Sequence, residues 1–304
     1  MTLWDTIGNF FYEQSQTWLT MPRLFCFAAV IVGYFFGMFQ SAFLIAKAMH
    51  VNIYTKGSGN AGTTNMLRVL GPLPGILTFL FDIGKAVAAV FLMKYVLIDW
   101  LHFSIDPIAV KLFTGLGVIL GHNFPAYLKF KGGKGVAVTC TLFAVIGEWK
   151  YVITGLVVFG LIVLFTRYVS LASMATVFIL SLEFIICSIK GWTVVSPEYL
   201  LDCQILVVLY AVLTIIMHRQ NIMRLIHGEE SRFSIHGSKN KAAEEEPQEN
   251  QKDSHTEEDT KENKNDPDTE EAADDRTGQN TASKPAKKKK KHKKKKSKNK
   301  KKKR

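Results

Sequence analysis

The chain has 304 residues, 48% of them hydrophobic, and a formal net charge of +12. These averages combine two different parts that meet near Ser238, because the residues after it contain no apolar run that could form a core. The last segment, Lys284–Arg304, holds 16 of the 38 basic residues and no acidic one, which leaves 22 basic against 26 acidic residues elsewhere. The high positive charge therefore does not indicate that the folded part binds nucleic acid.

The first candidate membrane span is Leu24–Ala46, which contains no charged residue and exceeds the roughly 20 residues that cross a bilayer. It is too long for a signal-peptide core, and no A-x-A-like cleavage site follows it. Its small residues Gly33, Gly37, Ser41 and Ala42 suit close helix packing. Six further candidates follow at Leu73–Ile98, Pro107–Leu120, Val136–Gly147, Tyr151–Phe165, Leu171–Ile189 and Tyr199–Met217. We therefore predict an all-α integral membrane protein with about seven transmembrane helices.

Two of these candidates, Pro107–Leu120 and Val136–Gly147, are short for a span, so they are tilted, re-entrant or extended into the polar loop between them. The four cysteines lie in or beside apolar runs, without the spacing of a zinc site, which predicts small buried hydrophobic residues and no disulfide framework. They are Cys26, Cys140, Cys187 and Cys203. We predict neither a metal nor a cofactor.

An odd number of spans places four polar segments on the same side of the membrane. They are Met49–Pro72, Gly121–Gly135, Arg167–Ser170 and the C-terminal part. This side collects most of the basic residues near the spans, namely Lys47, Lys56, Arg68, Lys129, Lys131, Lys134, Arg167, Arg219 and Arg224. The other side has only Arg23, Lys150, Lys190 and Lys111. By the positive-inside rule we expect a plasma-membrane protein whose polar loops and C-terminus are cytoplasmic.

Asp82, Lys85 and Glu183 are charged residues well inside predicted spans, where each needs a partner. Asp82 and Lys85 are three residues apart and share a helix face, so they pair with each other, or one of them faces the polar loops and braces them. For Glu183 we expect a basic partner from a neighbouring helix.

The first polar loop has glycines at 57, 59 and 62 in the pattern G-x-G-x-x-G. A dinucleotide site is excluded because a membrane helix, not a strand, precedes them. The glycines Gly57 and Gly59, with Asn60, predict a phosphate site in which backbone N–H groups converge on an anion. The alternative is a flexible linker with a solvated arginine.

A short helix is predicted after these glycines, capped by Thr63 and ending at Gly71-Pro72. Asn65 and Arg68 would lie on one face of it, where the arginine could bind phosphate with two parallel hydrogen bonds.

The second loop reads GHNFPAYLKFKGGKG from Gly121, with Lys131, Gly132, Gly133 and Lys134 before a helix start. It predicts a basic phosphate cradle, with a merely solvated basic loop as the alternative. A Walker A loop is excluded, since Leu128 stands where that motif has its first glycine and residue 135 is not Ser or Thr.

The third segment begins at His218, and His218, Asn221 and Arg224 recur every three residues. They predict a polar helix face directed at the other loops, with Gly228 ending the helix. An ordinary interfacial amphipathic helix is the alternative.

With these three motifs, GSGNAGTTNMLR, GHNFPAYLKFKGGKGVA and HRQNIMRLIHGEE, the chain resembles the bacterial acyl-phosphate:glycerol-3-phosphate acyltransferase (PlsY) family over Leu24–Glu230. Ala61 stands where the family more usually has proline. The resemblance implies transfer of a fatty acyl group from acyl phosphate to the 1-hydroxyl of glycerol 3-phosphate, giving lysophosphatidic acid and phosphate without acyl-CoA or acyl carrier protein. It also implies an active site that contains Ser58, His218 and Asn221, with Ser170 as a weaker addition. Arg68, Lys131, Lys134 and the backbone at Gly132 and Gly133 would hold the anions and offset developing charge.

Two chemical questions stay open on the sequence. The hydroxyl proton goes either to His218 or to a substrate phosphate, and transfer is either direct or through an acylated Ser58. The main rival function is transport of phosphorylated metabolites, but repeat symmetry, which is typical of transporters, is not found.

The chain thus divides into an N-terminal segment (1–23), a membrane acyltransferase domain (24–230), a polar linker (231–283) and a Lys-rich tail (284–304). By composition the linker and tail are expected to be disordered, and anionic lipid, RNA or the acidic linker itself could bind the tail. Specific nucleic-acid recognition is not expected. A membrane tether for nucleic acid or ribosomes is a third reading of the chain.

Overall fold

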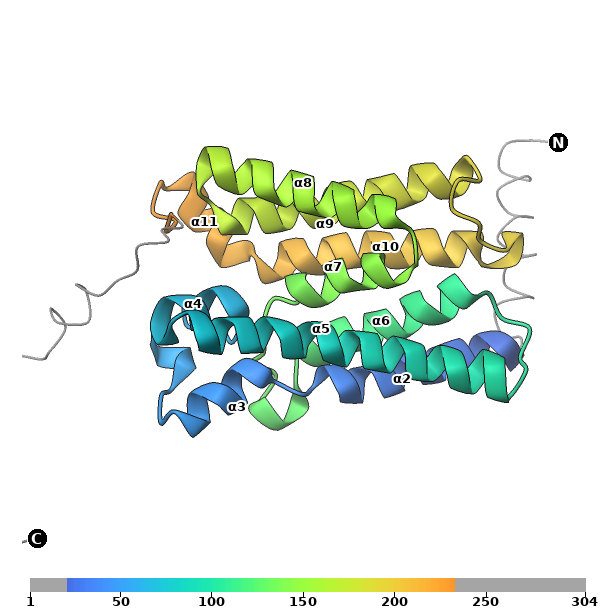
Figure 1. Cartoon of the computed structure of the whole chain (residues 1–304), viewed down its shortest axis with the longest axis horizontal. Coiled ribbons are helices and arrows are strands. Elements are labelled where there is room, and N and C mark those ends of the chain that lie inside the picture. Colours follow the sequence, from blue (N-terminus) through green and yellow to red (C-terminus); the bar gives the residue numbers. More distant parts are fainter. Residues whose placement is uncertain (1–20, 233–304) are drawn as a thin grey trace, which may run out of the picture. The chain divides into compact units, whose positions relative to one another are not determined.

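The computed structural model describes residues 21–232, and every regular element among them is a helix (Figure 1). Most of the N-terminal segment, the linker beyond residue 232 and the Lys-rich tail with its predicted partners lie outside the described residues. The longer helices are α2 (Met21–Gly37), α5 (Pro72–Lys94), α6 (Pro107–Asn123), α7 (Val136–Val145), α8 (Trp149–Thr166), α9 (Val169–Ile189) and α10 (Pro197–Met217). The short ones are α3 (Ser41–Ala48), α4 (Thr63–Leu70), α11 (Arg219–Ile226), the turns η1 (Ile53–Thr55) and η3 (Ala126–Leu128), and the π-helix η2 (Tyr95–Trp100).

Six helical stretches of the described chain are long and apolar enough to cross a membrane. They are 22–48, 72–100, 107–128, 149–166, 169–189 and 197–217. The remaining predicted span is α7, whose 10 residues rise only about 15 Å, half the thickness of the hydrocarbon core. In Figure 1, α7 lies between α5 and α8 and is shorter than both. The prediction of an all-α, multi-pass membrane protein is confirmed.

The outward-facing side chains of α8 form an apolar surface that is suited to contact with lipid. The side chains of Ile153, Leu164 and Phe165 are 50%, 71% and 79% exposed, and Tyr151 is the one buried residue of this helix. A continuous apolar surface of this kind is stable against hydrocarbon and not against water.

The first span differs from its prediction as one continuous helix. Residues 38–40 interrupt it, and α3 continues beyond the break. The break leaves backbone groups without partners inside a helix, and such groups need partners from elsewhere in the protein. The carbonyl of Phe39 receives a hydrogen bond from Lys85 of α5, at 2.8 Å.

Glycines bring α2 and α6 into backbone contact. A Cβ placed at Gly117 of α6 would lie 2.0 Å from the carbonyl oxygen of Val30, and one at Gly33 of α2 would lie 2.1 Å from that of Thr114. Gly37 and Gly121 are equally restricted, at 2.2 Å and 2.1 Å from the nearest backbone oxygens. The close packing predicted for Gly33 and Gly37 is confirmed.

Replacing Gly117 with Ala is therefore expected to push α2 and α6 apart. Overpacking of this kind costs roughly 1–3 kcal/mol, seen as a lower midpoint of thermal unfolding in detergent. Gly160→Ala in α8 is the matched control, because a Cβ there meets no atom within 4 Å. Equal midpoints for the two variants would contradict the packing argument.

The charged residues inside the spans are all partnered. Asp82 and Lys85 form an ion pair of 2.9 Å. The prediction that Glu183 has a basic partner was wrong. Its carboxylate instead accepts a hydrogen bond from the Thr154 hydroxyl of α8, at 3.2 Å. Its second carboxylate oxygen, Oε2, is buried and has no hydrogen-bond partner among the described residues.

Candidate active site

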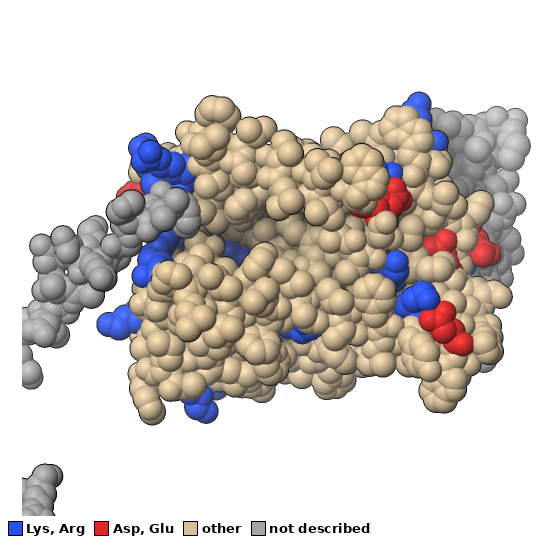
Figure 2. Space-filling model, in the orientation of Figure 1, with Lys and Arg blue, Asp and Glu red and all other residues tan. Residues whose placement is uncertain are grey.

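One cavity of about 710 Å³ collects all three polar segments. Figure 2 shows the surface hollowed between α5 and α8, with a basic side chain inside the hollow. The polar end of this cavity is lined by Gly57, Ser58, Asn60, Asn65, Arg68, Lys134, Ser170, His218, Asn221, Arg224 and Glu230. The prediction that these segments meet on one side of the bundle is confirmed by this shared cavity.

The first loop is shaped by Asn65, whose side chain is 2% exposed. Its Oδ1 accepts the Ser58 N–H at 2.8 Å, and its Nδ2 donates to the carbonyl of Lys56 at 3.1 Å. Gly57 has a φ of +59°, and a Cβ there would lie 2.3 Å from Asn65 Oδ1. Asn65 thus holds the loop backbone in place, while its predicted contact with phosphate stays a prediction.

The helix predicted after this loop is α4, and it ends at Gly71 as expected. Its N-cap is Gly62, not Thr63, which is the first helical residue. The buried Thr63 hydroxyl has no hydrogen-bond partner among the described residues and lines the cavity. The positive end of α4 therefore faces the cavity, with Arg68 exposed on the same helix.

The second loop contributes Lys134 to the cavity wall and keeps its other predicted residues behind it. Gly133 is buried and donates its N–H to the carbonyl of His122 at 3.0 Å. Lys131 is exposed, and its carbonyl accepts the Tyr54 hydroxyl at 2.8 Å, which joins the second loop to the first. Gly59, Lys131, Gly132 and Gly133 are not among the residues that line the cavity.

Lys134 joins the second loop to the third segment. Its ammonium group donates to Oδ1 of Asn221. Burial lowers the pKa of Lys134 to about 8; Glu230 opposes this shift, and the positive charges of Arg224 and Arg68 add to it. Lys134 is therefore a cation at neutral pH, and an anion that enters the cavity would stabilise that charge.

The third segment forms α11, and Gly228, with a φ of +73°, ends it as predicted. The chain then folds back so that Glu230 accepts hydrogen bonds from Asn221 Nδ2 at 2.6 Å and Arg224 Nε at 2.7 Å. These contacts turn Asn221 Oδ1 toward Lys134. Glu230 was not predicted from the sequence as a site residue. Gly228 could have indicated it, because a glycine that reverses the chain can return a carboxylate two residues later to the helix.

His218 lies directly after α10 and is 2% exposed. Its Nδ1 lies 2.8 Å from the carbonyl of Thr214, which can only accept, so Nδ1 carries the proton and Nε2 keeps a free lone pair. Burial, and then the positive charge of Lys134, lower the pKa of His218 to about 4. His218 is thus a neutral imidazole at pH 7, able to accept a proton at Nε2.

The cavity continues from its polar end into an apolar lobe that the sequence did not indicate. Its walls come from four helices and include Phe79, Cys140, Ala144, Val152, Leu156, Phe159 and Leu180. At its end stands Tyr151, whose hydroxyl hydrogen bonds to Thr193 at 2.6 Å. A ligand with an anionic head and a hydrocarbon tail matches both parts of this cavity.

Comparison with known proteins places the chain among acyltransferases. Residues 27–228 match the family model described as "Glycerol-3-phosphate acyltransferase". The glycerol-3-phosphate acyltransferase of Thermosipho melanesiensis is 38% identical over 212 residues, which are 69% of this chain and 93% of that protein. That of Shouchella clausii is 37% identical over 209 residues, 68% of this chain and 95% of the relative.

Solved structures agree with these relatives. The crystal structure of PlsY (YgiH), an integral membrane glycerol 3-phosphate acyltransferase, in its glycerol 3-phosphate form has a TM-score of 0.57 and 32% identity. The match covers 69% of this chain and 96% of that one. The lysophosphatidic acid form of the same enzyme has a TM-score of 0.56.

Proposed function

This chain belongs to the glycerol-3-phosphate acyltransferase family, and we propose that its two-part cavity is where acyl phosphate and glycerol 3-phosphate react. The protein transfers an acyl group to glycerol 3-phosphate and forms lysophosphatidic acid. The observation that carries the proposed site is one cavity with Arg68 and Lys134 at its polar end and an apolar lobe behind them. The two cations suit two phosphate groups, and the apolar lobe suits one fatty chain. A metabolite transporter would need no such lobe.

In the proposed reaction the 1-hydroxyl oxygen of glycerol 3-phosphate attacks the acyl carbonyl carbon. An ester C–O bond forms, the bond from the acyl carbon to the phosphate oxygen breaks, and phosphate leaves with that electron pair. Arg68 and Lys134 hold the phosphates and stabilise the negative charge that develops on the leaving group. Ser58 and Asn60 line the same end and bind polar parts of the substrates.

We assign the hydroxyl proton to Nε2 of His218, because that atom is unprotonated and its ring is fixed by Thr214. Transfer is direct, since the Ser58 side chain is exposed and the described residues place no hydrogen-bonded base beside it. An acyl-Ser58 adduct trapped by mass spectrometry would overturn the direct route.

The cavity is proposed to open on the cytoplasmic side of the plasma membrane, because it is lined by Arg68, Lys134 and Arg224 from the basic polar segments. Water-soluble glycerol 3-phosphate and membrane-dissolved acyl phosphate could meet there. Labelling of a cysteine placed at the exposed His227 by a membrane-impermeant reagent in intact cells would contradict this orientation.

The activity itself is tested with purified protein in proteoliposomes. Palmitoyl phosphate and glycerol 3-phosphate are expected to give lysophosphatidic acid and phosphate in equal amounts, whereas palmitoyl-CoA gives no product. Flux of glycerol 3-phosphate without product would support the transporter, and equal rates with palmitoyl-CoA would overturn the proposed donor. Truncation after residue 238 is expected to leave the rate unchanged, because the described residues already form the cavity with its polar end and its apolar lobe.

The apolar lobe predicts how chain-length preference can be changed. Gly155 of α8 lines the lobe, and its nearest neighbour there, Leu180 Cδ1, is 3.6 Å from an added Cβ. Gly155→Leu is expected to shorten the preferred acyl chain. Exclusion of about two methylenes loses about 1.6 kcal/mol, or a roughly tenfold fall in kcat/KM for palmitoyl relative to lauroyl phosphate.

Gly160→Leu is the matched control for this variant. It makes the same change on the same helix at an exposed position where an added Cβ meets no atom within 4 Å. A similar change of preference in both variants would show that the lobe does not hold the acyl chain.

A further inference from the structure

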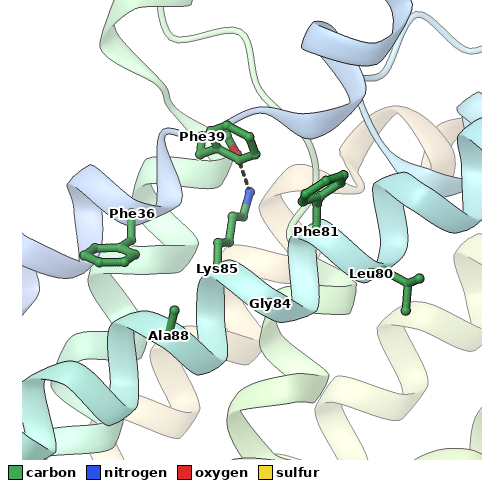
Figure 3. Close-up of a pocket in the computed structure, with 7 residues that line it drawn as sticks. All are labelled: Phe36, Phe39, Leu80, Phe81, Gly84, Lys85 and Ala88. Atoms are coloured by element: carbon green, nitrogen blue, oxygen red, sulfur yellow. Dashed lines mark hydrogen bonds between the residues drawn. The ribbon is translucent and has the colours of Figure 1, made fainter.

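Lys85 is a buried cation in the middle of a membrane span, and the reaction does not use it directly. It is 7% exposed, and Figure 3 shows it extending from α5 to the carbonyl of Phe39, between α2 and α3. Its ammonium group lies 2.8 Å from that carbonyl oxygen, 2.8 Å from Nδ1 of His122 and 2.9 Å from Oδ1 of Asp82. A buried ammonium has three N–H donors, and each of these has an acceptor here.

The same cluster includes the break in the first span. The Ser41 hydroxyl, at the start of α3, donates to Asp82 at 3.1 Å. Gln40 Nε2 donates to the carbonyl of His122 at 2.7 Å. The cluster therefore ties α5, the break between α2 and α3, and the end of α6 together in the core of the bundle.

His122 connects this cluster to the second loop. An ammonium group can only donate, so Nδ1 of His122 accepts from Lys85 and the ring proton lies on Nε2. That Nε2 lies against Gly133, because a Cβ added there would be only 2.1 Å from it. Gly133 also donates its N–H to the carbonyl of His122, at 3.0 Å. Both the ring and the backbone of His122 thus support the residue that precedes Lys134.

We propose that Lys85 and Asp82 are positioning residues for acyl transfer, which hold His122 and, through it, the Gly132–Lys134 turn against the substrate phosphate. The two alternatives given for Asp82 and Lys85, mutual pairing and bracing of a polar loop, then hold together. This inference rests on the proposed function, since its main readout is the acyl-transfer reaction. Asp82 and His122 both line the cavity wall beside the turn.

The test compares Lys85→Met with Gly133→Ala, which disturbs the same turn directly. In Gly133→Ala the KM is measured for each of the two substrates. The substrate whose KM rises is the one that the turn holds. Lys85→Met is expected to raise the same KM about tenfold and also to lower kcat, because the turn carries Lys134. An increase in the other substrate's KM, or a fall in kcat alone, would overturn the proposal.

A control separates positioning from simple loss of stability. Asp202→Asn breaks a comparably buried pair, in which Arg23 Nε lies 3.2 Å from Asp202. Asp202 lies on α10 about 24 Å from His218, by the rise of a helix over 16 residues. This variant is expected to unfold at a lower temperature with unchanged KM values.

Removal of both charges distinguishes the two roles further. The double variant Lys85→Met with Asp82→Asn leaves no unpaired buried charge, so its unfolding temperature should recover while the raised KM persists. If both the unfolding temperature and the KM returned to the wild-type values, Lys85 would only stabilise the fold.

A phosphate-binding readout covers the case in which the reaction differs from the proposed one. Inorganic phosphate is expected to raise the unfolding temperature of the wild type and less so that of Lys85→Met. Equal shifts would overturn the positioning role. An inactive wild type that still shows the difference would count against the proposed function alone.

Discussion

Lys134→Met is expected to lower kcat for lysophosphatidic acid formation by about 10²–10³-fold, the usual loss when a donor aimed at developing charge is removed. Lys134 is a half-buried cation in the cavity wall, and its ammonium group donates to Asn221 of the third segment. Steady-state kinetics with both substrates saturating measures the loss. Methionine keeps the length of the side chain, so packing changes little.

Lys129→Met is the control for Lys134→Met, because Lys129 is exposed on the same loop and does not line the cavity. Its kcat should stay close to that of the wild type. Equal losses in the two variants would mean that the general positive charge of the loop, and not the Lys134 ammonium, supports the reaction.

His218→Gln is expected to lower kcat by about 10²–10⁴-fold, the range for loss of a general base. His218→Asn adds a structural control, because its amide can still donate to the Thr214 carbonyl as Nδ1 does. Both variants should therefore fold like the wild type and be similarly slow. Near-normal turnover of His218→Gln would make the substrate phosphate the proton acceptor.

The pH dependence of the wild type follows from the same two groups. His218 must be neutral, and its pKa of about 4 means that this requirement fails only when the pH falls toward 4. Lys134 must be charged, and its pKa of about 8 means that activity declines as the pH rises through 8. In a plot of kcat/KM against pH, loss of the alkaline limb in Lys134→Met would assign that limb to Lys134.

Much of the fold could be predicted because a membrane helix is specified locally. A run of about 20 apolar residues crosses a bilayer whatever surrounds it, so spans such as Leu171–Ile189 and Tyr199–Met217 agree with α9 and α10 within a few residues. The glycines that end α4 and α11 are equally local, since a left-handed φ is a property of one residue. The three motifs also identified the family before any contact between them was known.

The site itself depended on contacts that no local pattern contains. Lys134 and Asn221 are 87 residues apart, and Lys85 and His122 are 37 apart. Whether Asn65 binds phosphate or holds its own loop depends on which backbone groups lie within reach of its amide. The apolar lobe likewise forms only where side chains of four helices come together, among them Phe79, Cys140 and Leu180.

Most of the membrane spans, the basic glycine-rich loops and the family of this chain could be predicted from single segments of its sequence. These properties follow from hydrophobicity and backbone freedom, which each segment has on its own. Helix packing, by contrast, brings Lys134, His218, Asn221 and Glu230 to the wall of one cavity, where we propose the active site, and sets Lys85 against His122. The physical reason is that hydrogen bonds and ion pairs act over a few ångströms, so helix packing alone brings distant residues into contact.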